Sequence, residues 1–397
     1  MPNCRFCNTP LGEPFLDLGH QPPSNALLTE DQLDEPEVYY PLKAYFCGNC
    51  YLVQIPEYIE PAGVFNESYP YYSSQSPSNV SHAKEFSEKM LKRFIPKRVL
   101  EIGSNDGYML QFFKEAGCNV LGVEPSKGPA DYAISEGIPT LITFFPPAEH
   151  IGGWDLICGI NTFAHQPDLH NFVKGLNFYL APQGVIVQEF PHLLKTMRGT
   201  QYDQFYHEHY NYFSLIFLRK LFEKYGLEIF DVEGIPEHGG SIRVYVAHKG
   251  TFPITPIVAK LTLDEMLYGL TERSTYTNFG YHVSELRLSM LDTLSGLSDQ
   301  LIFAYGAAAK GNTLLNSIPH ITERLVVDAI DRSPYKQGKY LPGIHLRIHE
   351  EAHIREWKPR YILILPWNLK DEIMNQLSYI REWGGRFIIP IPKVEIL

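Results

Sequence analysis

Two pairs of cysteines near the start of the chain have the spacing of metal ligands. Cys4 and Cys7 form one C-x-x-C pair, and Cys47 and Cys50 form the other. Four thiolates suit tetrahedral Zn²⁺ and leave no open coordination position, so we expect a structural zinc site. The 39 residues between the pairs exceed the usual zinc-ribbon spacing, so a longer loop must fold there. The alternative is two unrelated pairs of reduced thiols.

A glycine-containing turn marks a second chemical site within VLEIGSNDGYML, residues 99–110. The apolar residues at its start are typical of a buried strand, and a helical pattern follows Gly103 and Gly107. Glycines let the backbone approach a ligand, and the start of a helix offers free N–H groups. The spacing G-x-x-x-G differs from the dinucleotide fingerprint G-x-G-x-x-G. It therefore favours S-adenosylmethionine over NAD.

An acidic residue at the end of the next predicted strand supports the same cofactor. Glu124 follows the apolar run 120–123, and a carboxylate there can accept hydrogen bonds from two ribose hydroxyls. Asp155, in the following strand WDLI, is taken as further support. We expect S-adenosylmethionine to bind at residues 101–107, with Glu124 on its ribose.

A polar, aromatic segment after the predicted strand 184–187 carries a candidate base. Tyr206, His207, Glu208 and His209 follow one another there, beyond the carboxyl end of a parallel strand, where open α/β sheets bind ligands. Histidine is the usual general base near neutral pH, and a carboxylate can orient or charge it. The order H-E-H excludes an H-E-x-x-H zinc site at this position. An exposed loop with solvated histidines is the alternative.

Composition and charge limit the class of protein. The chain has 397 residues, 44% hydrophobic and 20% charged, which indicates a soluble protein of about two to three domains. The net charge of −11 argues against a nucleic-acid or membrane-surface binder but leaves an anionic substrate open. No apolar run reaches the roughly 20 residues of a membrane helix, and the start MPNCRFC has no signal core. We expect a cytoplasmic protein and take a monomer as the working expectation, although the sequence does not fix the oligomeric state.

Alternating strand and helix patterns predict two α/β units. Over residues 80–250 they predict a parallel sheet covered on both faces, ending in an antiparallel hairpin. A mostly helical connector follows, and a second, smaller unit begins at Leu301–Tyr305. The predicted strands of the two units are 99–102, 120–123, 154–158, 184–187, 227–232 and 241–247, then 301–305, 325–330, 361–365 and 387–391.

The order and spacing of these motifs resemble the nucleotide-sugar C-methyltransferase family, which methylates C3 of nucleotide-linked 4-keto-deoxysugars. The matching segments are the two cysteine pairs, YPYYSS at 69–74, EIGSNDG at 101–107, YHEH at 206–209, HGGSIRVY at 238–245 and YGAAAKGN at 305–312. The resemblance covers essentially the whole chain. It implies an α/β fold with a zinc-binding domain (1–75), a class I, Rossmann-like methyltransferase core (76–255), a helical connector (256–297) and a C-terminal Rossmann-like domain (298–397).

The resemblance also implies roles for the matched residues. His209 would remove the C3 proton, and Glu208 and Tyr206 would position or polarise the sugar. Either Tyr71 or Tyr72 would reach the substrate. The implied cofactor-binding residues are Glu101, Gly103, Asn105, Asp106, Gly107, Glu124 and Asn161, and those for the nucleotide diphosphate are His238, Ser241, Arg243 and Lys310.

Three other functions remain open from the sequence. The same framework could methylate another carbon, an oxygen or a nitrogen of a small molecule. The zinc unit could instead serve a non-catalytic docking module, which would not need S-adenosylmethionine. An NAD oxidoreductase is disfavoured because G-x-G-x-x-G is missing.

Lys310 has two interpretations. It lies in a loop that lacks the phosphate-loop spacing, so its side chain either contacts an anion or is simply solvated.

Overall fold

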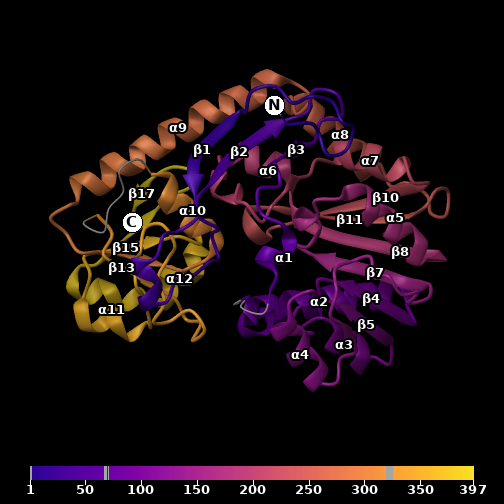
Figure 1. Cartoon of the computed structure of the whole chain (residues 1–397), viewed down its shortest axis with the longest axis horizontal. Helices are drawn as coiled ribbons and strands as arrows, with labels where there is room; N and C mark the ends of the chain where they lie inside the picture. The colour runs from indigo at the N-terminus through magenta and orange to yellow at the C-terminus, as the bar shows by residue number, and fades with distance from the viewer. Residues whose placement is uncertain (1, 67–68, 70, 319–324) are drawn as a thin grey trace. The chain divides into compact units, whose positions relative to one another are not determined.

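The computed structural model describes residues 2–66, 69, 71–318 and 325–397. The chain forms two compact units, each assembled from three separate segments (Figure 1). The first unit contains Met1–Gly12, Cys47–Leu194 and Tyr210–Thr271, and the second contains Glu13–Phe46, Lys195–His209 and Glu272–Leu397. The N-terminal residues therefore contribute to both units.

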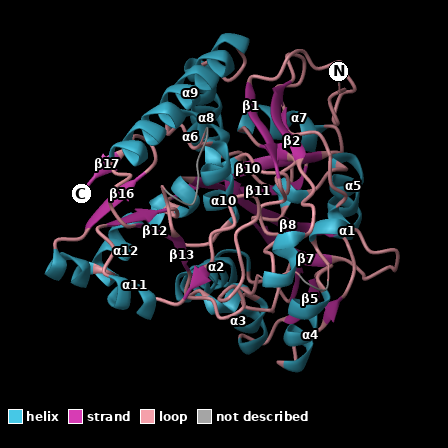
Figure 2. Ribbon diagram, turned by 60° about the vertical axis from the view of Figure 1, so that its left-hand side comes forward, coloured by secondary structure: helices cyan, strands magenta, loops and turns pink. Residues whose placement is uncertain are grey.

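A seven-stranded sheet forms the centre of the first unit (Figure 2). Its strand order is β10-β11-β8-β7-β4-β5-β6. The strands from β4 to β8 are parallel, whereas β11 runs antiparallel to β8 and β10 antiparallel to β11. The predicted parallel sheet with a terminal hairpin is thus confirmed. The strands are β4 (Arg98–Ile102), β5 (Asn119–Val123), β6 (Thr140–Leu141), β7 (Trp154–Ile160), β8 (Leu180–Pro191), β10 (Leu227–Ile235) and β11 (Ser241–His248).

Helices pack on this sheet through apolar faces. In α2 (Pro77–Phe94), Ala83, Phe86 and Met90 recur at helical spacing and are buried in one core cluster with Val99 of β4. Ser76 caps this helix by accepting a hydrogen bond from the N–H of Asn79. The other helices of the unit are α1 (Pro61–Val64), α3 (Leu110–Glu115), α4 (Lys127–Ser135), α5 (Leu169–Tyr179), α7 (Leu215–Glu223) and α8 (Pro256–Tyr268).

Short strands complete the N-terminal part of the chain. In the first unit, β3 (Val53–Gln54) pairs antiparallel with β9 (Asn211–Tyr212). In the second unit, β1 (Leu16–Gln21) pairs antiparallel with β2 (Tyr40–Phe46). The helix α6 (Leu193–Arg198) contains the boundary between the two units in the sequence.

The second unit contains a six-stranded sheet of order β14-β13-β12-β15-β16-β17. It is parallel apart from its last strand, β17, as expected for a Rossmann-like domain. Its strands are β12 (Ile302–Tyr305), β13 (Asp328–Ile330), β14 (Ile348–His349), β15 (Tyr361–Ile364), β16 (Arg386–Ile389) and β17 (Glu395–Ile396). Its helices are α9 (Arg273–Gly296), α10 (Ala309–Ser317), α11 (Ala352–Trp357) and α12 (Lys370–Gln376).

The predicted helical connector consists of two helices, α8 and α9. The first, α8, is followed by Gly269, whose φ of 91° is the left-handed conformation that commonly terminates helices. The second, α9, belongs to the other compact unit. Within the described residues, neither these helices nor any other is both long and apolar enough to span a bilayer.

Candidate functional site

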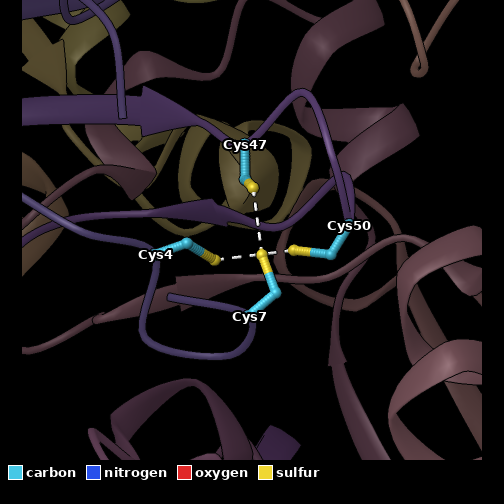
Figure 3. Close-up of side chains that lie close together, drawn as sticks. All are labelled: Cys4, Cys7, Cys47 and Cys50. Carbon is cyan, nitrogen blue, oxygen red and sulfur yellow. Dashed lines mark hydrogen bonds between the residues drawn. The ribbon is translucent and has the colours of Figure 1, made fainter. Parts of the chain in front are cut away.

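The four predicted zinc ligands converge in the first unit. Figure 3 shows their sulfur atoms pointing towards a common centre. The Sγ atoms of Cys4 and Cys50 are 3.5 Å apart, as are those of Cys7 and Cys47, and all four lie within 4.8 Å of one another. Zn–S bonds of about 2.3 Å in a tetrahedron require S···S separations of about 3.8 Å. The arrangement therefore fits a tetrahedral zinc ion.

Both cysteine pairs lie in turns of the same form. The N–H of Asn8 donates to the carbonyl of Cys4 at 2.8 Å, and the N–H of Tyr51 donates to the carbonyl of Cys47 at 2.9 Å. Asn8 and Tyr51 have φ angles of 59° and 73°, in the left-handed region. Hydrogen bonds with Cys47 and Cys50 lower the pKa of Cys4, which favours the thiolate form that binds metals.

The glycine-containing turn after β4 is tightly packed. Gly103 has a φ of 66°, and a Cβ atom there would lie 2.2 Å from Cγ2 of Thr162, so glycine alone fits without a shift. Glu124, at the end of β5, fixes the turn. Its carboxylate accepts hydrogen bonds from the N–H groups of Asn105 at 3.0 Å and Ser126 at 2.8 Å.

Three buried carboxylates gather around this turn, from Glu101, Asp106 and Glu124. Burial, followed by the charges of Asp106 and Glu124, raises the pKa of Glu101 well above its usual value. Within the described residues, Oε2 of Glu101 and Oδ1 of Asp106 have no hydrogen-bond partner. S-adenosylmethionine carries an ammonium group, a sulfonium and ribose hydroxyls. It therefore matches the carboxyl groups and the unused acceptors of this turn.

The segment that contains the candidate tyrosines lies against the same turn. The N–H of Ser73 donates to Oδ1 of Asn105 at 2.8 Å, and the N–H of Ser74 donates to Oδ2 of Asp106 at 3.0 Å. The Asn105 amide donates to the carbonyl of Tyr71 at 3.1 Å. The sequence did not reveal these contacts, because they involve backbone groups of residues 71–74. Pro70 of the YPYYSS motif lies outside the described residues.

The two candidate tyrosines differ in their surroundings. Tyr71 is 43% exposed, and its hydroxyl accepts a hydrogen bond from Nδ2 of Asn79 at 2.8 Å. Tyr72 is half-buried, with its ring edge-on to that of Tyr132. The choice between Tyr71 and Tyr72 stays open.

Two other predicted residues of the first unit contact each other. Nδ2 of Asn161, just after β7, lies 2.9 Å from Nε2 of His238. Both residues have positive φ angles, 57° and 55°. Ser241 donates its hydroxyl to the carbonyl of Glu237. Asn161 and His238, predicted separately for cofactor and substrate, thus form one polar pair.

Arg243 forms ion pairs with two carboxylates, those of Glu189 and Glu233. Nε and Nη2 of Arg243 lie 3.0 and 2.8 Å from the carboxylate of Glu189, and Nη1 lies 3.4 Å from that of Glu233. The side chain is 4% exposed and stacks over the ring of Phe86. Its role as a diphosphate contact stays a prediction.

The interpretation of Asp155 as support for the cofactor site was wrong. Asp155 lies near the start of β7, and its Oδ2 accepts hydrogen bonds from the N–H groups of Lys97 and Arg98 at 2.9 and 3.0 Å. Those groups precede and begin β4, so the contact is at the amino ends of parallel strands. Ligands bind at the opposite, carboxyl edge. Asp155 therefore holds two strands together.

The candidate base lies in the second unit, in a turn. The N–H of His209 donates to the carbonyl of Tyr206 at 2.9 Å. The same turn brings the hydroxyl of Tyr206 within 2.6 Å of Nε2 of His209, with ring centroids 4.1 Å apart. His207 lies away from this pair, since its Nε2 is 3.2 Å from the carbonyl of Pro41. Burial lowers the pKa of His207 to about 4.

Glu208 has a partner that the sequence did not suggest. Both of its carboxylate oxygens accept hydrogen bonds from Nδ2 of Asn25, at 2.8 and 2.9 Å. Burial raises the pKa of Glu208 to about 7, and the bond from Asn25 opposes this shift. Asn25 and Glu208 are 183 positions apart in the chain, so no local pattern links them. A carboxyl group with this pKa can exchange a proton near neutral pH.

Lys310 also lies in the second unit, in the first turn of α10. Its Nζ is 3.2 Å from Oδ1 of Asn368 and 5.5 Å from the ring centre of Trp367. The indole of Trp367 donates to the buried carboxylate of Asp203 at 2.7 Å. Lys310 is half-buried and has a polar partner, so it differs from a freely solvated lysine.

Comparisons with known proteins agree with this architecture. Three family models match the chain: "Putative zinc binding domain" over residues 4–65, "Methyltransferase domain" over 80–232, and "C-methyltransferase C-terminal domain" over 236–392. C-methyltransferase NovU from Streptomyces niveus is 32% identical over 406 residues, which cover 99% of this chain and 96% of that protein.

Solved structures of other proteins resemble part of the chain. The PH0226 protein from Pyrococcus horikoshii OT3 is 16% identical and covers 49% of this chain and 100% of its own, with a TM-score of 0.39. Magnesium protoporphyrin IX methyltransferase (ChlM) from Synechocystis PCC 6803, solved with bound S-adenosylmethionine, is 12% identical over 44% of this chain and 84% of its own, with a TM-score of 0.35.

The likeness to NovU extends over almost the full length of both chains. The matched methyltransferase domain contains the glycine turn and its carboxylates, and the matched zinc-binding domain contains the four cysteines. The chain therefore belongs to the C-methyltransferase family and is an S-adenosylmethionine-dependent enzyme with a four-cysteine zinc site.

Proposed function

We propose that this C-methyltransferase methylates C3 of a nucleotide-linked 4-keto-deoxysugar, in deoxysugar biosynthesis, with His209 as the base. The observation that carries the proposal is the buried pair of Tyr206 and His209, 2.6 Å apart, beside a carboxyl group whose pKa is about 7. Methylation of carbon needs such a base, whereas many methylations of oxygen or nitrogen need mainly alignment. The kinship with a C-methyltransferase supports the same reaction class.

The chemistry follows from the acidity of a hydrogen next to a ketone. His209 takes the C3 proton, and the electron pair of the C–H bond forms an enolate whose negative charge rests on the C4 oxygen. C3 then attacks the methyl group of S-adenosylmethionine. The new C–C bond forms as the C–S bond breaks, and S-adenosylhomocysteine leaves as a neutral thioether. Catalysis requires in-line alignment and stabilisation of the enolate charge.

The remaining residues have proposed supporting roles. The neutral carboxyl of Glu208 would donate a hydrogen bond to the C4 oxygen, a role that a raised pKa permits near neutral pH. Tyr206 would orient the imidazole of His209, and either Tyr71 or Tyr72 would contact the substrate. The proposed diphosphate contacts are His238, Ser241, Arg243 and Lys310.

A panel of substrates tests the proposed function directly. Pure protein is incubated with S-adenosylmethionine and dTDP-, GDP- or CDP-linked 4-keto-deoxysugars, and the products are analysed by mass spectrometry. We expect one nucleotide sugar to gain the mass of one methyl group. Consumption of S-adenosylmethionine with no methylated sugar in any reaction would contradict the proposal.

Replacing Glu124 by Ala should weaken the binding of S-adenosylmethionine. The carboxylate is proposed to accept hydrogen bonds from the ribose, and it also supports the turn through Asn105 and Ser126. Hydrogen bonds to charged groups contribute about 1.5–3 kcal/mol, so Kd should rise about 10- to 150-fold. Isothermal titration calorimetry measures the change, with Glu136→Ala at an exposed position as the matched control. An unchanged Kd would place the ribose elsewhere.

Replacing Asn25 by Ala should move the pH profile of methyl transfer. The hydrogen bond from Asn25 holds the pKa of Glu208 down against burial, so its loss raises that pKa further. If the neutral carboxyl is the active form, activity falls as pH rises through this pKa. The alkaline limb of kcat/KM should therefore shift to higher pH in Asn25→Ala and disappear in Glu208→Gln. A uniform loss at every pH, with the limb unmoved, would contradict this role.

A further inference from the structure

A second cluster of metal-ligating side chains lies in the C-terminal sheet, within the second unit. Asp328 begins β13, His349 ends β14, and His353 lies in the first turn of α11. Nε2 of His349 is 3.2 Å from Oδ1 of Asp328, and Nε2 of His353 is 3.2 Å from Oδ2. Ligand atoms of all three residues lie within 4.8 Å of one another. Three neighbouring elements therefore contribute one ligand each.

The sequence around these histidines has a metal-binding spacing. Residues 349–353 read HEEAH, which matches the H-E-x-x-H pattern that is missing at residues 207–209. In zinc enzymes this pattern places two histidines one helical turn apart on the same face. Here the first histidine ends a strand and the second begins a helix, and the two rings are parallel with centroids 3.9 Å apart.

The distances and ligand types suit a small divalent transition metal. Bonds of about 2.0–2.1 Å in a tetrahedron place neighbouring ligand atoms about 3.3 Å apart, close to both observed N···O separations of 3.2 Å. Two imidazoles and one carboxylate favour zinc-like ions, whereas calcium and magnesium prefer sites made of oxygen atoms alone. Three protein ligands also leave a fourth position for water.

The surroundings orient the two rings. Phe303 stacks on the ring of His353 with centroids 5.3 Å apart. Nδ1 of His353 lies 3.9 Å from a carboxylate oxygen of the exposed Glu356, which is beyond hydrogen-bond distance.

We propose that Asp328, His349 and His353 bind a divalent transition-metal ion, with zinc as the expected occupant. This site is separate in sequence from the four-cysteine site and shares no ligand with it. Its metal would join β13, β14 and the start of α11, and so would stabilise one edge of the C-terminal sheet.

Metal stoichiometry of the full-length protein tests the proposal. Protein is treated with a mild chelator, equilibrated with excess Zn²⁺, freed of unbound metal and analysed by elemental analysis. Wild type should bind about two zinc ions per chain, one in each site. His353→Ala and Asp328→Asn should bind about one, and His282→Ala, at an exposed histidine of α9, should keep both. Wild type with a single zinc, or two zinc ions in the Asp328 and His353 variants, would overturn the proposal.

Two further measurements separate metal binding from misfolding. Asp328→Asn preserves the size of the side chain, so its melting temperature before zinc is added should be close to that of wild type. Added zinc should then raise the melting temperature of wild type and not of Asp328→Asn, because a ligand stabilises only the state that binds it. With zinc retained by the cysteines, added Co²⁺ should give absorption bands of a nitrogen and oxygen site, without thiolate charge transfer. Their presence in His353→Ala would also overturn the proposal.

Discussion

Replacing His209 by Asn is expected to abolish both hydrogen exchange at C3 of the substrate and methyl transfer. Asparagine keeps a polar side chain next to Tyr206 but cannot accept the C3 proton at neutral pH. Loss of a general base costs about 10²–10⁴-fold in rate. Binding of S-adenosylmethionine and of the nucleotide sugar should stay close to that of wild type, because the histidine is proposed to act on the reacting hydrogen.

The exchange reaction isolates the proposed step from methyl transfer. The 4-keto substrate is incubated in D₂O with enzyme and S-adenosylhomocysteine, and loss of the C3 hydrogen signal is followed by NMR. Wild type should catalyse exchange if the enolate forms reversibly, and His209→Asn should not.

The neighbouring histidine supplies the matched control. His207 is buried, its pKa is about 4, and its Nε2 lies against the carbonyl of Pro41, so it is a poor base at neutral pH. His207→Asn should keep exchange within about tenfold of wild type, less than the loss of a general base causes. Activity of His209→Asn within the same range would assign the base elsewhere, with Tyr206 and His207 as the next candidates.

The double replacement of Cys4 and Cys47 by Ala is expected to remove the structural zinc. It takes one thiolate from each turn and leaves Cys7 and Cys50, too few to hold the metal. Structural zinc contributes apparent binding free energies of about 10–16 kcal/mol in small zinc domains. After weakly bound metal has been removed, elemental analysis should show that the double variant holds about one zinc per chain fewer than wild type. Limited proteolysis should cut the variant faster near both turns.

The remaining cysteines offer a control for this experiment. Cys118 lies outside the four-cysteine cluster and donates its thiol to the carbonyl of Pro96 at 3.2 Å. Cys118→Ala should therefore retain the tightly bound zinc. Full retention of that zinc by the double variant would refute the four-thiolate site.

The fold was largely predictable because its strands are short apolar runs separated by helical patterns. Residues 99–102 and 120–123 coincide with β4 and β5 to within one residue. Boundaries were less accurate where turn-forming residues lie inside a strand. Pro182 and Gly184 suggested a start at 184, whereas β8 extends from Leu180 to Pro191. Pro182 and Gly184 lie where the register of β8 against β7 shifts, between the pairs Trp154–Leu180 and Leu156–Val185.

Local spacing selected candidate residues but not their partners. The four cysteines converge as predicted, and the binding roles of the glycine turn and of Glu124 stay predictions. Asn25, which holds Glu208, could not be found in this way, since the contact links segments 183 positions apart. Asp155 was misassigned because its position near the start of its strand, at the amino edge of the parallel sheet, was not taken into account. Such contacts depend on tertiary structure.

The fate of the C3 hydrogen tests the proposed reaction most directly. A nucleotide-linked 4-keto-deoxysugar deuterated at C3 is incubated with the enzyme and S-adenosylmethionine, and the product is examined by NMR and mass spectrometry. The enolate mechanism predicts that the new methyl carbon is bonded to C3 and that the deuterium is lost. A methyl group on oxygen or nitrogen, with the deuterium retained at C3, would contradict it.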